Sequence, residues 1–347
     1  MTTQMAREIA EQPQAVRATL DRVLPERPRL RELAAGRRRV LFVARGSSDN
    51  AAVYGRYLLE AHAGVSAALA SPSVATHYGA RLDLTDAVVV AVSQSGSTAE
   101  IVETAQWARS CGATVIAVTN VDGSPLVDTA DHALVTAAGP ELAVPATKSY
   151  LAQLAAMTAI GTALAPRPEA LDDALARVPD EVGRLVSDAA GIDAAVEALS
   201  AAEHTIVSGR GLLMGTALEA ALKLEETCLR PVRGYSYADL RHGPISVVAS
   251  GVVALLVAAP DGPLVEPMTE LAADLARRGA RSIGIGGDAA YASACDVHVP
   301  GPDLPEPLAP LGAIVPAQLI VERLARSLGL DPDNPRGLRK VTQTDPA

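Results

Sequence analysis

The two halves of this chain carry matching residues at one constant separation, and this internal repeat constrains the fold more than any other feature. Three landmarks recur in order: Arg45-Gly46 as Arg210-Gly211, Val88 as Val253, and Asp131 as Asp296. In both halves short β-branched runs alternate with helical stretches, a pattern typical of parallel sheets with helices on both faces. The sequence therefore predicts an α/β fold of two tandem domains, each a doubly wound parallel sheet flanked by helices.

The length of 347 residues agrees with two domains of about 150 residues each. We expect a helical arm over 1–36, a first domain over 37–168, a helical linker over 169–200, a second domain over 201–330 and a tail over 331–347. The expected strands are Val40–Ala44, Val88–Val92, Thr114–Val118 and Ala133–Val135, then Thr205–Val207, Val252–Val257, Ser282–Ile285 and Val297–Val299. The expected helices include Asn50–His62, Thr98–Ser110, Ala146–Leu164 and Glu169–Leu199.

Charge and composition exclude several classes of protein. The net charge of -10 argues against a nucleic-acid partner, since phosphate backbones require a basic surface. The longest apolar run, Val247 to Ala259, is shorter than the ~20 residues that span a bilayer, and no secretory leader opens the chain. The three cysteines form no CxxC pair, so we expect no metal site and no disulfide framework. We expect a cytoplasmic protein whose basic arm packs as helix or contacts another subunit, or alternatively binds an anionic partner.

A dense run of hydroxyl side chains follows the expected strand Val88–Val92. Residues 93–98 read Ser-Gln-Ser-Gly-Ser-Thr and lead into a helix, and Gly46-Ser47-Ser48 forms a similar turn after the first strand. Backbone N–H groups at a helix start, together with hydroxyls, bind a phosphate dianion without Lys or Arg. The alternative is that these residues only cap helices. The equivalent turn of the second half, residues 258–263, contains two prolines and an acid, so we expect only the first domain to bind phosphate.

Nucleotide motifs are absent or imperfect. No GxxxxGK[ST] sequence occurs, and Gly209-Arg210-Gly211 followed by Gly215 departs from the dinucleotide fingerprint in spacing. We therefore expect no nucleotide and no other cofactor.

Only three of the 30 basic residues are lysines: Lys148, Lys223 and Lys340. Arg cannot act as a nucleophile, whereas a lysine amine can form an imine with a carbonyl group. Lys223 shares one face of a predicted helix with Glu219 and Glu226. We predict Glu226 as a general base with Lys223 as its electrostatic partner; the alternative is a solvated ion-pair stripe.

Two further residues could take part in proton transfer or covalent chemistry. His242 lies in the turn Arg241-His242-Gly243-Pro244 and could exchange a proton near neutral pH, although a lone histidine is often structural. Lys340 lies in the tail, where it could be merely solvated or could be delivered to a site by a mobile segment.

Taken together, these motifs resemble a known family. Six segments appear in the order of the isomerase half of glucosamine-6-phosphate synthase, which is built of SIS (sugar isomerase) domains: RGSS (45–48), SQSGST (93–98), PATKSY (145–150), ALEAALKLEE (217–226), LRHGP (240–244) and PRGLRK (335–340). The resemblance covers nearly the whole chain after about residue 36.

The resemblance implies a role for individual residues. The phosphate of a sugar would be bound by Ser48, Ser93, Gln94, Ser95 and Thr98, within turns that also contain Gly46 and Ser47. Val144 would contact the sugar through its backbone, with Ala146 close by, and Glu226 would carry a proton between the first two carbons. His242 would open the sugar ring from a neighbouring subunit, and Lys340 would form an imine with the ketose. A homodimer with shared active sites would follow.

Departures from the family pattern bear on the reaction. The synthase has an N-terminal glutaminase with a terminal cysteine, whereas position 2 here is Thr2, so we expect no ammonia release from glutamine. Ala146 replaces a more usual Ser, and Ser97 replaces an acid. We therefore expect a deaminase of the glutaminase-less type that converts glucosamine 6-phosphate to fructose 6-phosphate and ammonia. The alternatives are a fructosamine-phosphate deglycase, an ammonia-dependent or partner-dependent synthase, and a non-catalytic sugar-phosphate sensor.

Overall fold

The computed structural model describes residues 2–341, which divide by their contacts into two units. Among the described residues, the first-sheet unit contains Gln14–Glu141, Lys148–Asp173 and 339–341. The second-sheet unit contains 2–13, Leu142–Thr147 and Ala174–Leu338. The chain thus passes between the units several times, and the domain boundaries expected from the sequence remain a prediction.

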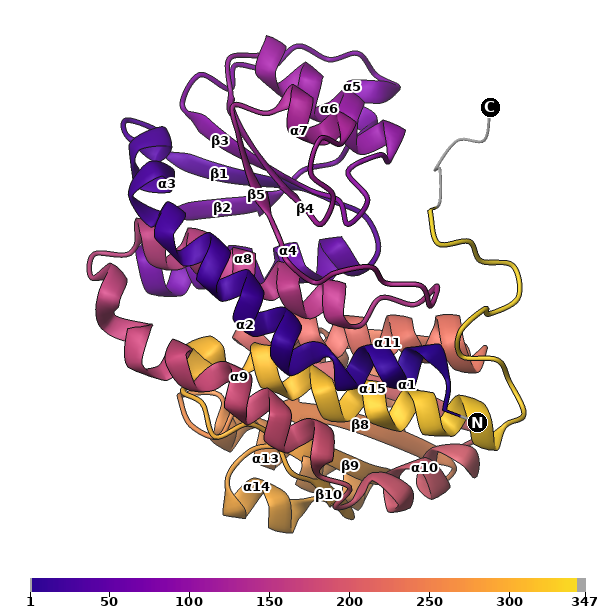
Figure 1. The fold of residues 1–347 in the computed structure, drawn as a ribbon. Helices are drawn as coiled ribbons and strands as arrows, with labels where there is room; N and C mark the ends of the chain where they lie inside the picture. The colour runs from indigo at the N-terminus through magenta and orange to yellow at the C-terminus, as the bar shows by residue number, and fades with distance from the viewer. Residues whose placement is uncertain (1, 342–347) are drawn as a thin grey trace. The chain divides into compact units, whose positions relative to one another are not determined.

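The first-sheet unit is built on a parallel sheet of five strands in the order β2-β1-β3-β4-β5. The strands are β1 (Arg39–Val43), β2 (Ser66–Leu69), β3 (Ala87–Val92), β4 (Thr114–Thr119) and β5 (His132–Val135). Every residue of β3 and β4 is buried, as expected for central strands that helices cover on both faces. Figure 1 shows α5, α6 and α7 on one face of this sheet, with α4 and α8 on the other.

The second-sheet unit has a parallel sheet of the same topology. Its strands, in the order β10-β9-β8-β6-β7, are β6 (His204–Gly209), β7 (Val232–Ser236), β8 (Val252–Ala258), β9 (Arg281–Gly286) and β10 (Val297–Val299). Strand β8 is buried throughout and is the counterpart of β3. Helices α13 and α14 lie on one face of this sheet, and α11 and α15 on the other (Figure 1).

The landmarks matched in the sequence occupy equivalent places in the two sheets. Val88 of β3 lies beside Val40 of β1, and Val253 of β8 lies beside Thr205 of β6. The carboxylate of Asp131 accepts an N–H at the start of β4 (2.8 Å), and that of Asp296 does the same at the start of β9 (2.7 Å). The two sheets therefore share strand order, register and an edge contact.

The helices are shorter and more numerous than the sequence pattern indicates. The α-helices are α1 (Gln4–Ala10), α2 (Gln12–Val23), α3 (Arg27–Ala34), α4 (Ser47–Leu58), α5 (Ser73–Thr76), α6 (Ala99–Ser110), α7 (Pro125–Thr129), α8 (Lys148–Leu164), α9 (Asp172–Ser187), α10 (Ile192–Ser200), α11 (Met214–Cys228), α12 (Tyr237–Arg241), α13 (Val265–Arg277), α14 (Ala289–Ala294) and α15 (Pro310–Ser327). Short 3₁₀ or π segments are η1 (Leu24–Glu26), η2 (Leu59–Ala63), η3 (Pro168–Leu171), η4 (Gly211–Leu213), η5 (Pro244–Val247) and η6 (Glu306–Leu308).

One expectation about the elements is wrong. The helix predicted over Glu169–Leu199 is broken into η3, α9 and α10. The break comes at Gly191, whose φ of +74° is left-handed and whose added Cβ would lie 2.1 Å from the carbonyl oxygen of His298. Gly191 is the N-cap residue of α10, and both its left-handed φ and its close contact with the chain beside β10 favour glycine there.

The sequence pattern also missed two of the four edge strands, β2 and β7. Their side chains are only partly buried, so they lack the continuous apolar run that identifies the central strands. Within residues 2–341, no helix is both long enough and apolar enough to cross a membrane.

Candidate functional site

The two hydroxyl-rich turns lie side by side at the carboxyl ends of the strands of the first sheet, which we call its carboxyl edge, or simply its edge. Strands β1 and β3 are neighbours, and the chain leaves their carboxyl ends toward opposite faces, into α4 and α6 respectively. In an open parallel sheet, ligands bind at such a switch point. The turns 46–48 and 93–98 therefore occupy the position where this topology places a ligand.

Gly96 fixes the shape of the turn after β3. Its φ of +63° is left-handed, and a Cβ added to it would lie 2.1 Å from Oγ of Ser124. The carbonyl oxygen of Gln94 accepts the N–H of Asn120 at 3.0 Å, which ties the turn to the loop after β4. Backbone contacts therefore help to hold the turn in this shape.

The hydroxyl groups of this turn act only partly as helix caps. Thr98 precedes α6, yet its side chain accepts no hydrogen bond from the first amides of that helix. The hydroxyl oxygens of Ser93 and Thr98 lie 3.3 Å apart, and Ser95 Oγ accepts the N–H of Ser97 at 3.2 Å. Ser95 and Thr98 are partly exposed, so their oxygens can be reached by a ligand.

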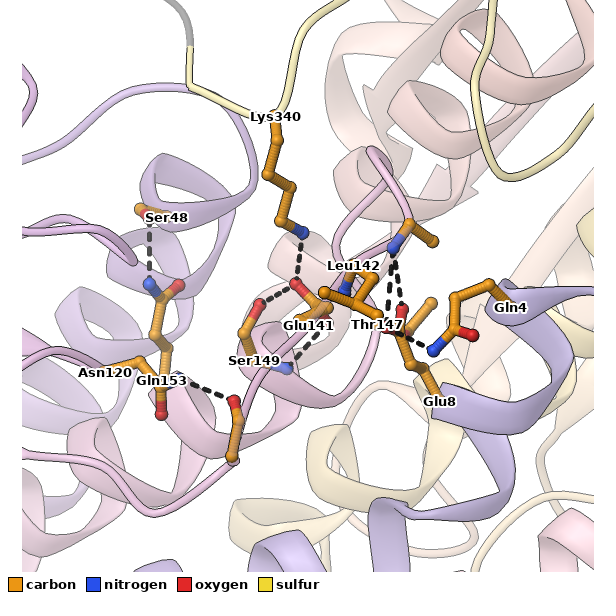
Figure 2. Close-up of polar contacts among 12 residues, drawn as sticks. Gln4, Glu8, Ser48, Asn120, Glu141, Leu142, Thr147, Ser149, Gln153 and Lys340 are labelled. Carbon is orange, nitrogen blue, oxygen red and sulfur yellow. Dashed lines mark hydrogen bonds and ion pairs between the residues drawn. The ribbon is translucent and has the colours of Figure 1, made fainter.

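The turn after β1 is anchored to helix α8. Gly46 precedes α4 with a φ of +56°, and Ser47 and Ser48 open that helix. Ser48 is buried, and its Oγ accepts a hydrogen bond from Nε2 of Gln153 at 2.9 Å (Figure 2). Burial raises the pKa of the neighbouring Asp49, although Arg45 and Arg56 act to lower it.

The guanidinium of Arg45 at this edge already has an acidic partner. Its Nε and Nη2 donate to the carboxylate of Glu100, in the first turn of α6, at 2.9 and 2.7 Å. The carboxylate is buried and the geometry is bidentate, which makes this one of the stronger kinds of ion pair. An anion bound here would therefore depend mainly on amides and hydroxyls.

The equivalent edge of the second sheet is filled. A Cβ added to Gly211 would lie 2.4 Å from Cδ1 of Leu264, and the cavity beside them has a volume of about 10 Å³. Asp261 accepts the backbone N–H of Glu306 at 2.7 Å. Burial and the Asp261 carboxylate raise the pKa of Glu306. Two carboxylates and little free volume make this edge unsuitable for a phosphate.

Helix α11 brings three predicted residues together in the second-sheet unit. Lys223 forms an ion pair with Glu226, and its Nζ lies 3.4 Å from Oε1 of Glu219. The side chains of Lys223 and Glu219 are 1% and 0% exposed, whereas that of Glu226 is 24% exposed. Buried charges are costly unless they are paired, so Lys223 compensates both acids. Glu226 is the member of the cluster that a substrate could reach.

The other predicted residues of this unit lie in loops. His242 is exposed directly after α12, and Gly243 follows it with a φ of +119°. The N–H of Val144 donates to the carbonyl oxygen of Asp333 at 2.8 Å, which leaves the Val144 carbonyl for any contact with a ligand. Ala146, in the same loop, is partly exposed.

Lys340 belongs to the first-sheet unit and forms an ion pair that the sequence did not predict. Its Nζ donates to Oε2 of Glu141 at 2.7 Å (Figure 2). The same carboxylate accepts the N–H and Oγ–H of Ser149, at 3.1 and 2.5 Å. Ser149 lies in the first turn of α8, and Gln153 follows one turn later. Since residues four apart on a helix are neighbours, α8 links the Lys340 amine to the Ser48 turn.

Comparison with known proteins shows the family. The SIS domain family matches residues 33–163. The glutamine–fructose-6-phosphate aminotransferase (isomerizing) of Symbiobacterium thermophilum is 36% identical over 97% of this chain. A crystal structure from Silicibacter pomeroyi, provisionally named a phosphosugar isomerase, is 33% identical; the match covers 95% of this chain and 100% of that one, with a TM-score of 0.83. This chain belongs to the SIS domain family.

The SIS chain also resembles part of a larger enzyme. The C-terminal domain of glucosamine-fructose-6-phosphate aminotransferase from Francisella tularensis is 28% identical, with a TM-score of 0.84 over 96% of this chain and 99% of that one. The SIS chain spans 58% of the length of the Symbiobacterium enzyme.

Among residues 2–341, no group of three or more His, Cys, Asp or Glu side chains could hold a metal ion.

Sequence reasoning on this SIS chain overlooked Glu141 and Gln153. Each pairs with a residue that the sequence did single out, Lys340 and Ser48 respectively. The available signal was their position: Glu141 lies just before the segment 145–150 of the family pattern, and Gln153 lies just after it.

Proposed function

We propose that this SIS protein converts glucosamine 6-phosphate and water into fructose 6-phosphate and ammonia. The observation that carries the proposal is the arrangement along α8. Ser149 donates to the Glu141 carboxylate that binds Lys340. One turn away, Gln153 donates to Ser48 of the turn 46–48, which we call the phosphate-type turn. An amine and a phosphate-type turn attached to one helix suit a sugar that carries phosphate at one end and reacts at the other.

The phosphate would be bound by amides and hydroxyls of the turns 46–48 and 93–98. These groups lie at the start of α4 and α6, where the helix dipoles favour a dianion. The filled edge of the second sheet supports the expectation that only the first sheet binds phosphate.

Proton transfer is assigned to the α11 cluster and His242. Glu226 would remove the proton from C2 of the open-chain amino sugar and deliver it to C1, which leaves an imine at C2. The buried ammonium of Lys223 compensates the charge of Glu226, and Glu219 completes the cluster. His242 would open the sugar ring.

Lys340 would then take part in releasing the amine. Its amine adds to the C2 imine, ammonia leaves, and water hydrolyses the resulting lysine imine to fructose 6-phosphate. Val144 and Ala146 would contact the sugar from their loop.

The test is incubation of the protein with glucosamine 6-phosphate. Ammonia and fructose 6-phosphate should appear in equal amounts. Absence of product from glucosamine 6-phosphate and from other amino-sugar phosphates would refute an enzymatic role and favour a sugar-phosphate sensor.

A second candidate is the reverse reaction, synthesis of glucosamine 6-phosphate from fructose 6-phosphate and ammonia or a partner that supplies it. The name of the Symbiobacterium relative favours this direction. Supplying ammonium with fructose 6-phosphate and measuring glucosamine 6-phosphate at equal enzyme concentration compares the two directions. Release of amine from fructosamine phosphates would instead indicate a deglycase.

The architecture of the whole protein forms part of the proposal. The shared strand order and register favour two tandem SIS domains over residues 37–168 and 201–330, with an arm, a linker and a tail around them. We also propose a homodimer with shared active sites, which measurement of the mass in solution would test.

A further inference from the structure

We propose that Glu141 is a positioning residue for Lys340, whose amine it docks beside α8 before substrate binds. This inference rests on the proposed function for its purpose, but the docking itself can be measured without any sugar.

The carboxylate of Glu141 is built as a fixed receptor. Its side chain is fully buried, and Ser149 donates to it twice, from the backbone N–H at 3.1 Å and from Oγ at 2.5 Å. Two donors from the first turn of a helix hold both oxygens in place. A buried carboxylate is costly without a compensating cation, and Lys340 supplies one at 2.7 Å.

The amine comes from a segment that has no regular structure of its own. Lys340 lies thirteen positions after Ser327, the last residue of α15, and is outside any helix or strand. Ordering such a segment costs backbone conformational entropy, so a specific anchor is needed to give the amine one position. The Lys340 side chain remains 26% exposed, so a dissolved reagent or substrate can reach it.

The location of the receptor gives it a function. Ser149 and Gln153 lie one turn apart on α8, and Gln153 holds Ser48 at 2.9 Å. Docking on Glu141 therefore sets the amine at a defined distance from the phosphate-type turn, as Figure 2 shows for these side chains. Misplacement of a reacting group by about 1 Å can lower a rate about 100-fold, so an anchor of this kind can control turnover.

Chemical labelling of Lys340 tests the docking directly. The other two lysines, Lys148 and Lys223, are 2% and 1% exposed, so among the lysines an acylating reagent should modify Lys340 selectively. Mass spectrometry of the peptide that contains Lys340 follows this reaction separately from that of the α-amino group. In sugar-free buffer, the reagent should acylate Lys340 about 10-fold faster in Glu141→Gln than in the unsubstituted protein, because the amine no longer pairs with a carboxylate. Glu103→Gln, which removes an exposed acid from α6, should label at the unsubstituted rate.

Two readouts decide the matter. Equal labelling rates in Glu141→Gln and the unsubstituted protein would overturn the docking. If Glu141→Gln fails to fold, Ser149→Ala, which keeps the carboxylate but removes one of its donors, is labelled instead. Faster labelling of Lys340 in that variant supports the proposal, and an unchanged rate overturns it.

With glucosamine 6-phosphate, Glu141→Gln should lower kcat about 10-fold to 100-fold with little change in KM. An unsubstituted protein without activity would refute the proposed function while leaving the labelling result intact.

Discussion

Hydroxyl groups, not cations, line the turn after β3. Gly96 shapes the turn through its left-handed backbone, and Arg45 at the same edge is occupied by Glu100. Ser95 and Thr98 present partly exposed oxygens. Recognition of phosphate at this edge would therefore rest on hydrogen bonds whose loss can be measured one side chain at a time.

Removing two of these hydroxyls should weaken the binding of every phosphorylated sugar alike. For Ser95→Ala combined with Thr98→Ala, we expect the affinity for fructose 6-phosphate to fall at least about 150-fold, since each of the two hydrogen bonds to a charged group is worth about 1.5–3 kcal/mol. Calorimetric titration measures the Kd. Ser110→Ala, at the exposed end of α6, is the control. An unchanged Kd would show that phosphate binds elsewhere.

Exchanging the tail lysine should separate catalysis from binding. Lys340→Arg keeps the charge that Glu141 binds but cannot form an imine, so turnover of glucosamine 6-phosphate should fall by about 100-fold or more while sugar-phosphate affinity persists. Steady-state kinetics and titration together give both quantities. Arg336→Lys, a charge-conserving change at an exposed tail position, should behave like the unsubstituted protein. Full activity in Lys340→Arg would remove the amine from the mechanism.

Helix α1 has a specific structural task in the second-sheet unit. The fully buried carboxylate of Glu8 accepts the N–H groups of Leu142 and Ala143, at 2.5 and 3.3 Å, and Nε2 of Gln4 at 3.0 Å. Asp333 accepts the N–H groups of Gln4 and Met5 at the start of the same helix. The arm therefore fixes the loop that carries Val144 within the second-sheet unit.

Truncating the buried acid of α1 should destabilise the protein. Glu8→Ala leaves backbone donors of the loop without their acceptor, which costs about 1–3 kcal/mol for each buried group. We expect a loss of about 2 kcal/mol in the free energy of unfolding, measured by urea denaturation. Glu11→Ala, an exposed acid on the same arm, should change it little. If the two variants are equally stable, the Glu8 contacts contribute nothing.

Glu306, at the filled edge of the second sheet, should make the stability of the protein depend on pH. Burial and Asp261 raise the pKa of Glu306 above its usual 4.5, so the fold favours the protonated form. The stabilisation that protonation gives is present below the unfolded pKa and is lost as pH rises through the raised folded pKa. Glu306→Gln, which stays neutral, should therefore raise the Tm at pH 7 by about 2 °C, and the gain should vanish near pH 4. Scanning calorimetry at both pH values measures it; a gain that persists at pH 4 would contradict this cause.

At the scale of the whole molecule, two sheets of identical strand order differ at the carboxyl ends of their strands. One keeps a hydroxyl-rich turn, and the other has Leu264 and two carboxylates in the equivalent place. A ligand that binds only the native state stabilises it by mass action. Sugar phosphates should therefore act through the first sheet alone.

Thermal unfolding with ligand tests this division. Fructose 6-phosphate at 100 times its Kd should stabilise the native state by about 2.7 kcal/mol and raise the Tm, whereas fructose should not. At the same concentration, the variant with both Ser95→Ala and Thr98→Ala should retain no more than about 0.3 kcal/mol of this stabilisation, because its Kd is at least about 150-fold higher. A shift of undiminished size in this variant would place the phosphate at another site.

The sequence by itself determined the features that depend on neighbouring residues. Buried runs such as those of β3 and β8 identify central strands, the turn 93–98 identifies a helix start with hydroxyls, and the spacing of Glu219, Lys223 and Glu226 places them on one helical face. These signals are local because side-chain direction repeats every two residues in a strand and every 3.6 in a helix. They fail where burial is partial, which is why β2 and β7 were missed.

Only the tertiary structure decided which distant residues meet. Lys340 and Glu141 are 199 positions apart, and Gln153 and Ser48 are 105 apart. No periodicity relates such pairs, since their contact depends on the path that the chain takes between the two residues. The same is true of Leu264, whose place over Gly211 closes the second edge. The folded chain brings these groups together for two reasons. A buried charge is costly unless an opposite charge compensates it, and a close-packed interior leaves few empty cavities.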